Sequence, residues 1–478
     1  MPSIQTIVIV KFRESTGLRL QGDRFVGVAH AEELQVTLRD FPGVVPKRVF
    51  TRPDEQLRPQ ALVGKGVAPA SPDRSLFYKF IAPSPADATR LLAKMKQLTS
   101  VENAYIEPQY GPPIARLARM AMGIPAIGAT PDFSDRQTYL DPAPGGIDAR
   151  YAWQISGDKP GAGVCVADVE GGWVLGHEDF QARRPSLEYG TIGKDDEWVQ
   201  HGTACLGEGI ASKNLGGVIG VAHGVDQVYC FSIFSEDPAL ADGVADAIDH
   251  AAGRLGVGDI MLIELHAVGP KGTGEGQGAY IPVEFWDANF AAIRGATDRG
   301  VVVVAAAGNG GVDLDRSVYE NKFDRAQRDS GAILVGAGAP PGSYDQPDRS
   351  RLAFSNWGGR LDVQGYGSSV CTTGYGDLQT DPDEGRWYTA LFNGTSSAAP
   401  MVWGAAAVLQ SIAKGKRGNP LPPLEMRDLL SETGSAQQDA TDAPVSQRIG
   451  PRPDLRAAIQ KLLVLRSSTG RRLRRPPP

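Results

Sequence analysis

Cysteine is scarce in this chain of 478 residues. There are four cysteines, Cys165, Cys205, Cys230 and Cys371, and no two of them form a Cys-x-x-Cys pair. A disulfide framework of the kind that holds small secreted domains together is therefore excluded, and so is a zinc knuckle.

Long apolar runs are also absent. A membrane-spanning helix needs roughly 18 or more consecutive apolar residues, and Val301–Gly308, among the longest apolar runs, is far shorter. A signal peptide has basic residues before its apolar stretch, whereas no basic residue precedes the N-terminal apolar stretch Ile4–Val10. We expect no membrane span and no classical export signal, and hence a protein that is cytoplasmic or secreted without a classical signal peptide.

Charge of one sign is not in excess. The 49 Lys and Arg residues nearly balance the 55 Asp and Glu residues, which gives a net charge of −6 and argues against nucleic acid as a partner. A hydrophobic content of 41% excludes wholesale disorder. Glycine, in contrast, is abundant at 58 residues, which is typical of loop-rich α/β enzymes.

Residues 1–110 form the first predicted unit. The patterns predict strands and helices in the order β-α-β-α-β, at Ile4–Phe12, Ala31–Phe41, Ser75–Ile81, Pro85–Leu98 and Val101–Ile106. This order indicates a small α+β open sandwich, with residues 51–75 as a long loop. The unit carries a net charge of +4 and the rest of the chain −10, so docking of one on the other is favoured.

Residues 111–145 are rich in proline and glycine and are predicted to be a linker that carries a short helix. From 146 to 465, apolar runs alternate with alanine-rich helical segments, at Gly163–Ala167, Gln227–Ile233, Ile260–Leu265, Val301–Ala307 and Ala332–Gly336. Strands that alternate with helices predict a parallel sheet covered on both faces, an α/β domain. Residues 466–478 hold five arginines and end in three prolines. We expect a solvated, disordered tail rather than a binding arm.

Four reactive side chains lie at the ends of predicted elements: Asp168, His201, Asn309 and Ser396. Alone, each has an ordinary structural explanation, such as a helix cap or a turn position. Together they supply what acyl transfer requires, namely a hydroxyl nucleophile, an imidazole base, a carboxylate that fixes the tautomer, and donors to the oxyanion. A serine that begins a helix also offers its backbone N–H and the helix dipole to the developing negative charge.

These segments resemble the subtilisin-like serine proteases. The resemblance rests on Asp168 in its strand, on Ala-Ala-Gly-Asn at 306–309, and on two longer motifs, His-Gly-Thr at 201–203 with Gly207 and Gly-Thr-Ser-Ser-Ala-Ala-Pro at 394–400. It covers about residues 145–465, with the motifs in the family's order. It implies a doubly wound, mostly parallel sheet with helices on both faces, and a serine endopeptidase that cleaves peptide bonds in protein substrates through an acyl-enzyme. Asp168 would orient His201, His201 would act as base and then acid, Ser396 as nucleophile, and Asn309 as oxyanion donor.

The resemblance has further implications. His266, Ala267, Val268 and Gly308 would contact substrate, and Val268 would add bulk where the family usually has glycine. His266 would be either a specificity element or a structural residue at the rim. Residues 101–110 resemble the end of the family's propeptide, so the N-terminal module would act as inhibitor and chaperone until activation, alone or beside a separate inhibitor. No cofactor is required for the chemistry. Asp179 and Asn214 resemble two ligands of a structural calcium site, at which six to eight oxygens are needed.

The sequence departs from the family pattern immediately after Asp168. Val169 and Glu170 stand where the family has serine or threonine and then glycine. We interpret Glu170 as a local hydrogen-bonding or capping residue. Cys205, one helical turn after His201, resembles the cysteine of a thiol-containing branch, where a bound soft ion would displace the histidine. The alternative function is a catalytically silent, protein-binding pseudoprotease; an esterase would place its serine first in the order of the triad.

Overall fold

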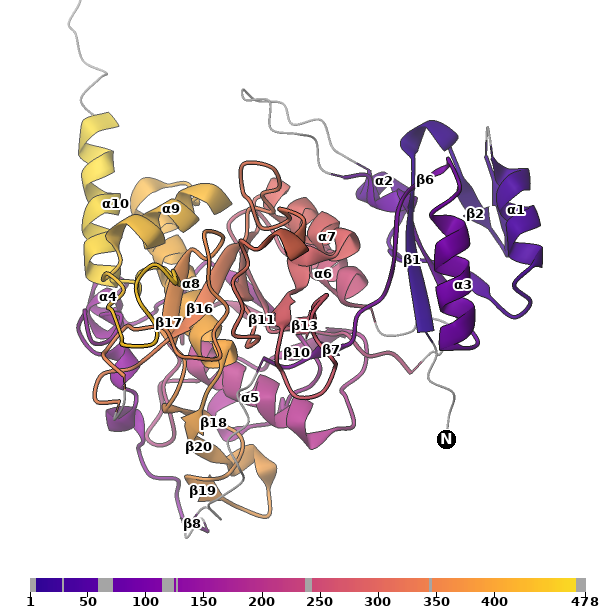
Figure 1. Cartoon of the computed structure of the whole chain (residues 1–478). Coiled ribbons are helices and arrows are strands. Elements are labelled where there is room, and N and C mark those ends of the chain that lie inside the picture. Colours follow the sequence, from indigo (N-terminus) through magenta and orange to yellow (C-terminus); the bar gives the residue numbers. More distant parts are fainter. Residues whose placement is uncertain are drawn as a thin grey trace, which may run out of the picture.

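The computed structural model describes residues 6–27, 30–58, 72–113, 124–125, 128–236, 243–343 and 346–469. These residues form an N-terminal module and a large domain, which lie side by side (Figure 1). Of the helices in this described part of the chain, none combines the length and apolar composition that crossing a lipid bilayer requires.

The N-terminal module is an antiparallel sheet of four strands in the order β4-β5-β1-β6. The strands of this sheet are β1 (Thr6–Phe12), β4 (Val45–Arg48), β5 (Phe77–Ala82) and β6 (Val101–Ile106), and a separate hairpin consists of β2 (Arg19–Gln21) and β3 (Arg24–Val26). Its helices are α1 (Ala31–Arg39), α2 (Asp54–Leu57) and α3 (Pro85–Met95), with 3₁₀ turns at Glu14–Thr16 and Arg74–Leu76. The hairpin β2–β3, the strand β4 and the short helix α2 were not predicted, because they are too short to show a periodic pattern. The predicted loop at 51–75 lies partly outside the described residues.

Strand β1 shows why this module both folds and docks. Successive side chains of a strand point to opposite faces. Val8 and Val10 face the core of the module, whereas Ile9 joins a second hydrophobic cluster that continues into the large domain. The module therefore buries both faces of its sheet, one under its own helices and one against its neighbour.

The large domain is built on a seven-stranded parallel sheet in the order β10-β11-β9-β12-β15-β16-β17. Its strands are β9 (Cys165–Glu170), β10 (Ser186–Tyr189), β11 (Gln227–Ser232), β12 (Ile260–Ile263), β15 (Val302–Ala306), β16 (Ile333–Gly338) and β17 (Val363–Tyr366). Both faces of the central strands are buried, which is why they read as continuous apolar runs in the sequence.

Helices cover both faces of this sheet (Figure 1). They are α4 (Ala149–Ile155), α5 (Asp196–Ile210), α6 (Val244–Arg254), α7 (Asp287–Asp298), α8 (Thr395–Arg417), α9 (Pro423–Thr433) and α10 (Leu455–Thr469). Helices α4, α5, α8, α9 and α10 contribute to the hydrophobic cluster on one face, and α6 and α7 to the cluster on the other. The predicted parallel sheet covered on both faces is present.

Small strands and turns outside the main sheet complete the domain. The strands are β7 (Tyr110–Gly111), β8 (Ile124–Pro125), β13 (His266–Val268), β14 (Tyr280–Pro282), β18 (Val370–Thr373), β19 (Gln379–Thr380) and β20 (Tyr388–Phe392). The 3₁₀ turns are Ser134–Arg136, Thr138–Leu140, Glu178–Phe180, Val283–Phe285, Ser317–Tyr319 and Glu384–Arg386. Strands β14, β13 and β7, in that order, form a three-stranded antiparallel sheet that brings the end of the N-terminal module onto the large domain.

Two predicted boundaries differ from the structure. In the predicted linker at 111–145, Tyr139 and Leu140 belong to the hydrophobic core of the large domain, so its second half is part of that domain. Helix α10 continues to Thr469, four residues into the predicted tail, and the remaining tail residues lie outside the described part.

The N-terminal module docks on helices α6 and α7 through paired charges as well as apolar contacts. Arg52 and Arg74 both form ion pairs with Asp249 of α6, whose side chain is 2% exposed. Asn103 of β6 donates a hydrogen bond of 2.5 Å to the carboxylate of Asp287, the first residue of α7. At these contacts the arginines belong to the N-terminal module and the aspartates to the large domain.

Candidate active site

Three of the four reactive side chains identified in the sequence lie at or next to the ends of their elements, at one edge of the sheet, and the fourth, Asp168, lies within a strand. His201 lies in α5, Ser396 is the second residue of α8, and Asn309 follows strand β15. Asp168 lies in strand β9. Because the carboxyl ends of parallel strands meet at one edge, elements far apart in sequence converge there.

The carboxylate that contacts the histidine is Glu170, not Asp168. His201 Nδ1 is hydrogen bonded to Glu170 Oε1, and both side chains are fully buried. Asp168 Oδ2 instead accepts a hydrogen bond of 2.8 Å from the indole Nε1 of Trp173. The structure therefore does not show the predicted contact between Asp168 and His201, and it does not confine Glu170 to a local hydrogen-bonding or capping role.

The difference comes from the length of one strand. The sequence reading ended the strand at Ala167, which placed Asp168 at the edge of the sheet. Strand β9 in fact continues to Glu170, and residues two apart point to the same face. Asp168 and Glu170 thus lie on one face of the strand. Glu170 is at the strand end, where its carboxylate reaches the imidazole ring of His201 in α5.

The sequence did contain a pattern that identifies Glu170. The family pattern has an acidic residue followed by a small residue and then glycine. Read from Glu170, the chain gives Glu-Gly-Gly, which satisfies that pattern, whereas Asp168 is followed by Val169. In the structure, a side chain on Gly171 would collide with Trp198 at 2.4 Å, so this turn needs glycine after the acid.

A cluster of buried acids surrounds the pair. Asp168, Glu170, Glu208 and Glu264 are all fully buried, and no lysine or arginine among the described residues forms an ion pair with them. Burial raises the pKa of all four carboxyl groups, and the mutual repulsion between Asp168 and Glu170 raises the pKa of Asp168 further. Burial lowers the pKa of His201 to about 3, although Asp168 and Glu197 oppose that shift. Strong perturbation of this kind is typical of catalytic centres.

The reactive atoms remain available. Within the described residues, His201 Nε2 and Ser396 Oγ are buried and have no hydrogen-bond partner of ordinary geometry. Glu264, which follows strand β12, lies beside Ser396, whose hydroxyl opposes the burial-driven rise in the pKa of that carboxyl group. Glu264 is a member of the site that the sequence reading missed, because it looks like an ordinary strand residue.

The predicted oxyanion donor is fixed to the start of the serine helix. Asn309 Oδ1 accepts hydrogen bonds of 2.9 Å from both the backbone N–H and the hydroxyl of Thr395. Its Nδ2 donates to Gln277 Oε1 at 3.0 Å. Gln277 was not predicted, because it lies in a polar loop with no motif.

The predicted substrate residues lie along β13. His266 and Ala267 pair with Gly111 and Tyr110 of β7, and the N–H of Val268 donates to Gln109 O at 3.0 Å. The ring of His266 is fully buried, and its Nδ1 accepts the N–H of Asn309 at 3.2 Å. His266 is therefore a buried residue that holds the backbone of Asn309, and it does not lie at an exposed rim.

Gly308 supports the same corner through its backbone. It has a φ of +86°, and a side chain there would lie 3.0 Å from Asn356 and 3.2 Å from His266. Its N–H donates to Thr395 Oγ1 at 3.1 Å. A residue with a side chain would strain this turn and push Asn309 out of place.

Cys205 lies against the histidine, as its spacing predicts. Its Sγ is 3.8 Å from His201 Nδ1 and 3.8 Å from Ser396 O. Glu170, His201 and Cys205 are the one group in the described part of the chain whose histidine, cysteine or carboxylate atoms lie close enough together to hold a metal ion.

The two predicted calcium ligands, Asp179 and Asn214, are hydrogen bonded to each other. Asn214 Nδ2 donates to Asp179 Oδ1 at 2.8 Å, and the N–H of Val218 donates to Asp179 Oδ2 at 2.9 Å. Both carboxylate oxygens are thus committed to N–H donors, and Asn214 presents its nitrogen, not its oxygen. Burial raises the pKa of Asp179 to about 6. This donor set does not fit calcium, which needs six to eight oxygen ligands.

Comparison with known proteins identifies the family. The model of the subtilase family matches residues 161–450, which is more than half of the chain. The chain belongs to the subtilase family. It is 27% identical over 293 residues to subtilisin DY of Bacillus licheniformis, an alignment that covers 60% of this chain and 89% of that protein. It is 30% identical over 251 residues to subtilisin BL of Lederbergia lenta, covering 52% and 77% of the two chains.

The subtilase fold is also found in a solved relative. Fervidolysin from Fervidobacterium pennivorans, a keratinolytic enzyme related to subtilisin, superposes with a TM-score of 0.55 at 18% identity, over 96% of this chain and 61% of that one. The predicted fold and family are confirmed, and this subtilase is a serine endopeptidase. As a protease, it acts on protein or peptide substrates.

Proposed function

We propose that this subtilase cleaves peptide bonds through an acyl-enzyme formed on Ser396, with Glu170 in place of the expected aspartate. The observation that carries the proposal is the buried hydrogen bond between Glu170 and His201 Nδ1. A carboxylate on Nδ1 fixes the tautomer in which Nε2 is free to accept a proton. The longer glutamate reaches the ring from two residues further along the strand than the predicted Asp168.

The steps follow from these positions. His201 Nε2 takes the proton of Ser396 as its oxygen attacks the substrate carbonyl, and later returns it to the leaving amine. The carbonyl oxygen gains negative charge, and the N–H of Ser396, at the N-terminus of α8, stabilises it together with the helix dipole. Asn309 would turn its amide from Gln277 to the oxyanion as the second donor.

The test compares three variants of the full chain on a peptide substrate. Ser396→Ala should lower kcat/KM by several orders of magnitude, and Glu170→Gln by about 10⁴, because the amide selects the wrong tautomer. Glu208→Gln, which changes a buried acid of helix α5, the helix that carries His201, is the matched control and should retain activity. Equal thermal stability of the variants would exclude misfolding. Undiminished hydrolysis in Ser396→Ala would mean that the chain is a silent pseudoprotease carrying a contaminant's activity.

Asn309→Ala tests the oxyanion donor separately. Loss of such a donor costs about 10²–10³ in kcat with little change in KM. The measurement is steady-state kinetics on the same peptide. A loss confined to KM would make Asn309 a binding residue held by Gln277.

The N-terminal module is proposed to restrain the enzyme. Two features support this proposal: β7 lies along the substrate strand β13, and Arg52 and Arg74 tie the module to the buried Asp249. Replacing both arginines by alanine in the full chain should raise the initial rate on a short peptide. Arg48→Ala, which removes an ion pair internal to the module, is the control. Equal rates in the two variants would favour a permanent accessory domain.

A further inference from the structure

Glu264 is a buried acid to which the proposed steps give no role. It directly follows strand β12, is fully buried, and neither of its carboxyl oxygens has a hydrogen-bond partner of ordinary geometry among the described residues. The titratable groups around it are Asp168 and Glu170 of β9 and Cys205 and Glu208 of α5. A buried polar group without a partner costs stability, so it is expected where chemistry requires it.

The backbone aims this carboxyl group at the helices that carry the histidine and the serine. Successive residues of an extended segment point to opposite faces of a sheet. Ile263 and Leu265, on either side of Glu264, both belong to the hydrophobic cluster on the side of α6 and α7, so Glu264 points to the other face. Helices α5 and α8 pack on that other face, and they carry His201 and Ser396.

Strand β12 also lies between the two strands that bring other groups to the site. On one side it pairs with β9, where Ile263 lies opposite Val169 and the N–H of Glu264 donates to Val169 O at 3.2 Å. Glu264 is therefore level with Glu170. On the other side β12 pairs with β15, the strand that leads to Asn309. Glu264 thus lies between the carboxylate that contacts the histidine and the predicted oxyanion donor, on the face where the serine helix begins.

The group that Glu264 meets there is the hydroxyl of Ser396. Ser396 Oγ is buried and also lacks a hydrogen-bond partner of ordinary geometry among the described residues. Burial, and then repulsion from Glu170 and Asp168, raise the pKa of Glu264, and the Ser396 hydroxyl opposes that rise. The raised pKa favours the protonated form. A protonated carboxyl group can donate a hydrogen bond, whereas an ionised one only accepts.

We propose that Glu264 is a positioning residue for the nucleophile and that it acts in its protonated form. The inference rests on the proposed acyl-enzyme mechanism and adds a residue to it. Protonated Glu264 donates to a lone pair of Ser396 Oγ, so the serine's own hydrogen is left for His201 Nε2. Ionised Glu264 would accept that hydrogen and draw it away from the base. During attack the proton of Ser396 passes to His201, and Glu264 keeps its own.

The first experiment measures kcat and KM on one peptide, from acid to alkaline pH, for variants of the full chain. Glu264→Leu removes the hydrogen bond and should lower kcat about 10- to 100-fold with little change in KM, because the hydroxyl loses its alignment. Glu264→Gln keeps an N–H donor and cannot ionise, so it should retain kcat within about threefold. Wild type should lose activity at alkaline pH as Glu264 ionises, and Glu264→Gln should lose less.

Glu208→Leu is the matched control, because it removes another buried acid of the same cluster. It should keep kcat within about threefold of wild type. Thermal unfolding of each variant separates a loss of fold from a loss of rate. Equal kcat in Glu264→Leu and Glu264→Gln would overturn the inference, and so would an alkaline limb that is the same in Glu264→Gln as in wild type.

The second experiment follows the labelling of Ser396 by a fluorophosphonate, measured by intact mass, and separates this inference from the proposed mechanism. Labelling should be about tenfold or more slower in Glu264→Leu than in Glu264→Gln. Labelling and hydrolysis that depend on Ser396 and Glu170, but are equal in all the Glu264 variants, overturn the inference and leave the mechanism standing. No labelling and no hydrolysis, even by the Arg52→Ala/Arg74→Ala variant, overturn both.

Discussion

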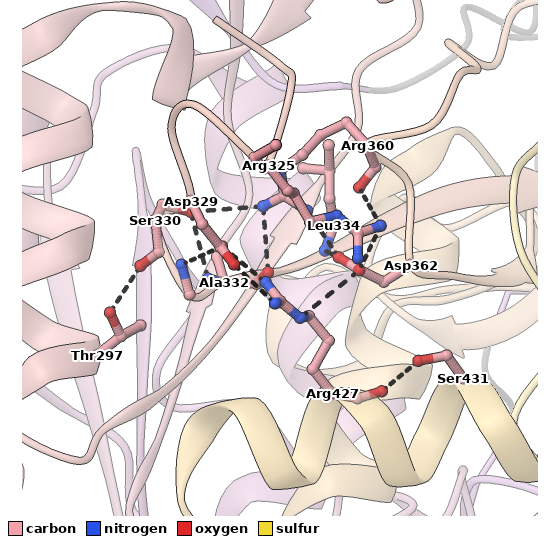
Figure 2. Close-up of polar contacts among 12 residues, drawn as sticks. Thr297, Arg325, Asp329, Ser330, Ala332, Leu334, Arg360, Asp362, Arg427 and Ser431 are labelled. Carbon is pink, nitrogen blue, oxygen red and sulfur yellow. Dashed lines mark hydrogen bonds and ion pairs between the residues drawn. The ribbon is translucent and has the colours of Figure 1, made fainter. Parts of the chain in front are cut away.

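Two buried clusters of charged side chains in the large domain have opposite character. Around Arg360, charged groups face opposite charges: Arg360 pairs with Glu284 and with Asp362. Arg427 of α9 pairs with Asp329 in the same cluster, and Figure 2 shows these two residues beside Arg360 and Asp362. Around His201, four buried acids have one imidazole among them. The charged groups around His201 are fully buried, whereas Asp329 in the first cluster is 24% exposed, and the two clusters also differ in how their charges are paired.

The difference is visible in the pKa values. At the first cluster, burial would raise the pKa of Glu284, but the Arg360 guanidinium outweighs it and holds that pKa below its usual value. At the second, burial prevails, and the carboxyl groups are held well above theirs. Paired charges stabilise the fold, whereas poorly paired ones cost stability and are kept where chemistry needs them.

Breaking the paired cluster should have the largest effect on stability. Arg360→Met leaves Glu284 and Asp362 buried without their central cation, which should cost about 3–5 kcal/mol. The measurement is the free energy of unfolding from urea titration. Lys461→Met, which removes an exposed pair with Glu432, is the control and should cost about 1 kcal/mol or less. Equal losses in both variants would mean that the buried network contributes little.

The poorly paired cluster should instead be sensitive to a soft cation. A mercurial bound to Cys205 would displace the ring of His201, and a shift near 1 Å can cost ~10² in rate. We expect inhibition of peptide hydrolysis by stoichiometric mercurial in wild type and resistance in Cys205→Ala. Cys371→Ala is the control and should remain sensitive. Sensitivity that persists in Cys205→Ala would place the reactive thiol elsewhere.

The pH dependence of stability should belong to the paired cluster. Although burial opposes it, the two hydrogen bonds from Arg427 lower the pKa of Asp329 to about 2, against 3.8 for the free group. A lowered pKa gives stability that is present above pH 4 and lost as the pH falls toward 2, about 2 kcal/mol in all. Unfolding of wild type and Arg427→Met at pH 5 and pH 2.5 measures it. Parallel losses in the two chains would contradict the assignment.

The same comparison shows what the sequence could predict. The parallel sheet, the family motifs and the positions of His201, Asn309 and Ser396 follow from local patterns, because each has a strand or a helix start beside it. Glu170 depended on where one strand ends, which is the least determined feature of a pattern. Glu264 and Gln277 join the site only through tertiary packing, and so do the ion pairs of Arg360, which connect residues far apart in the chain.

The smallest expected effect is also the most diagnostic, because it distinguishes the two carboxyl groups of strand β9. Burial and the neighbouring Glu170 raise the pKa of Asp168, which favours the neutral form of that carboxyl group. Asparagine has the same shape as a neutral aspartic acid, and its Oδ1 can accept the Trp173 indole N–H as Asp168 does. Asp168→Asn should therefore retain kcat/KM within about twofold, with an unchanged pH profile.

Asp168→Leu completes that test. It removes the acceptor and leaves the buried indole N–H unsatisfied, which should cost about 1–3 kcal/mol of stability while the hydrogen bond from Glu170 to His201 persists. A structural role for Asp168 thus appears in the unfolding free energy, and a catalytic role would appear in the rate. If Asp168→Asn lost about 10⁴ in kcat/KM while Glu170→Gln kept its activity, Asp168 would be the residue that orients His201. The contact between Glu170 and the imidazole would then belong to the restrained form of the chain alone.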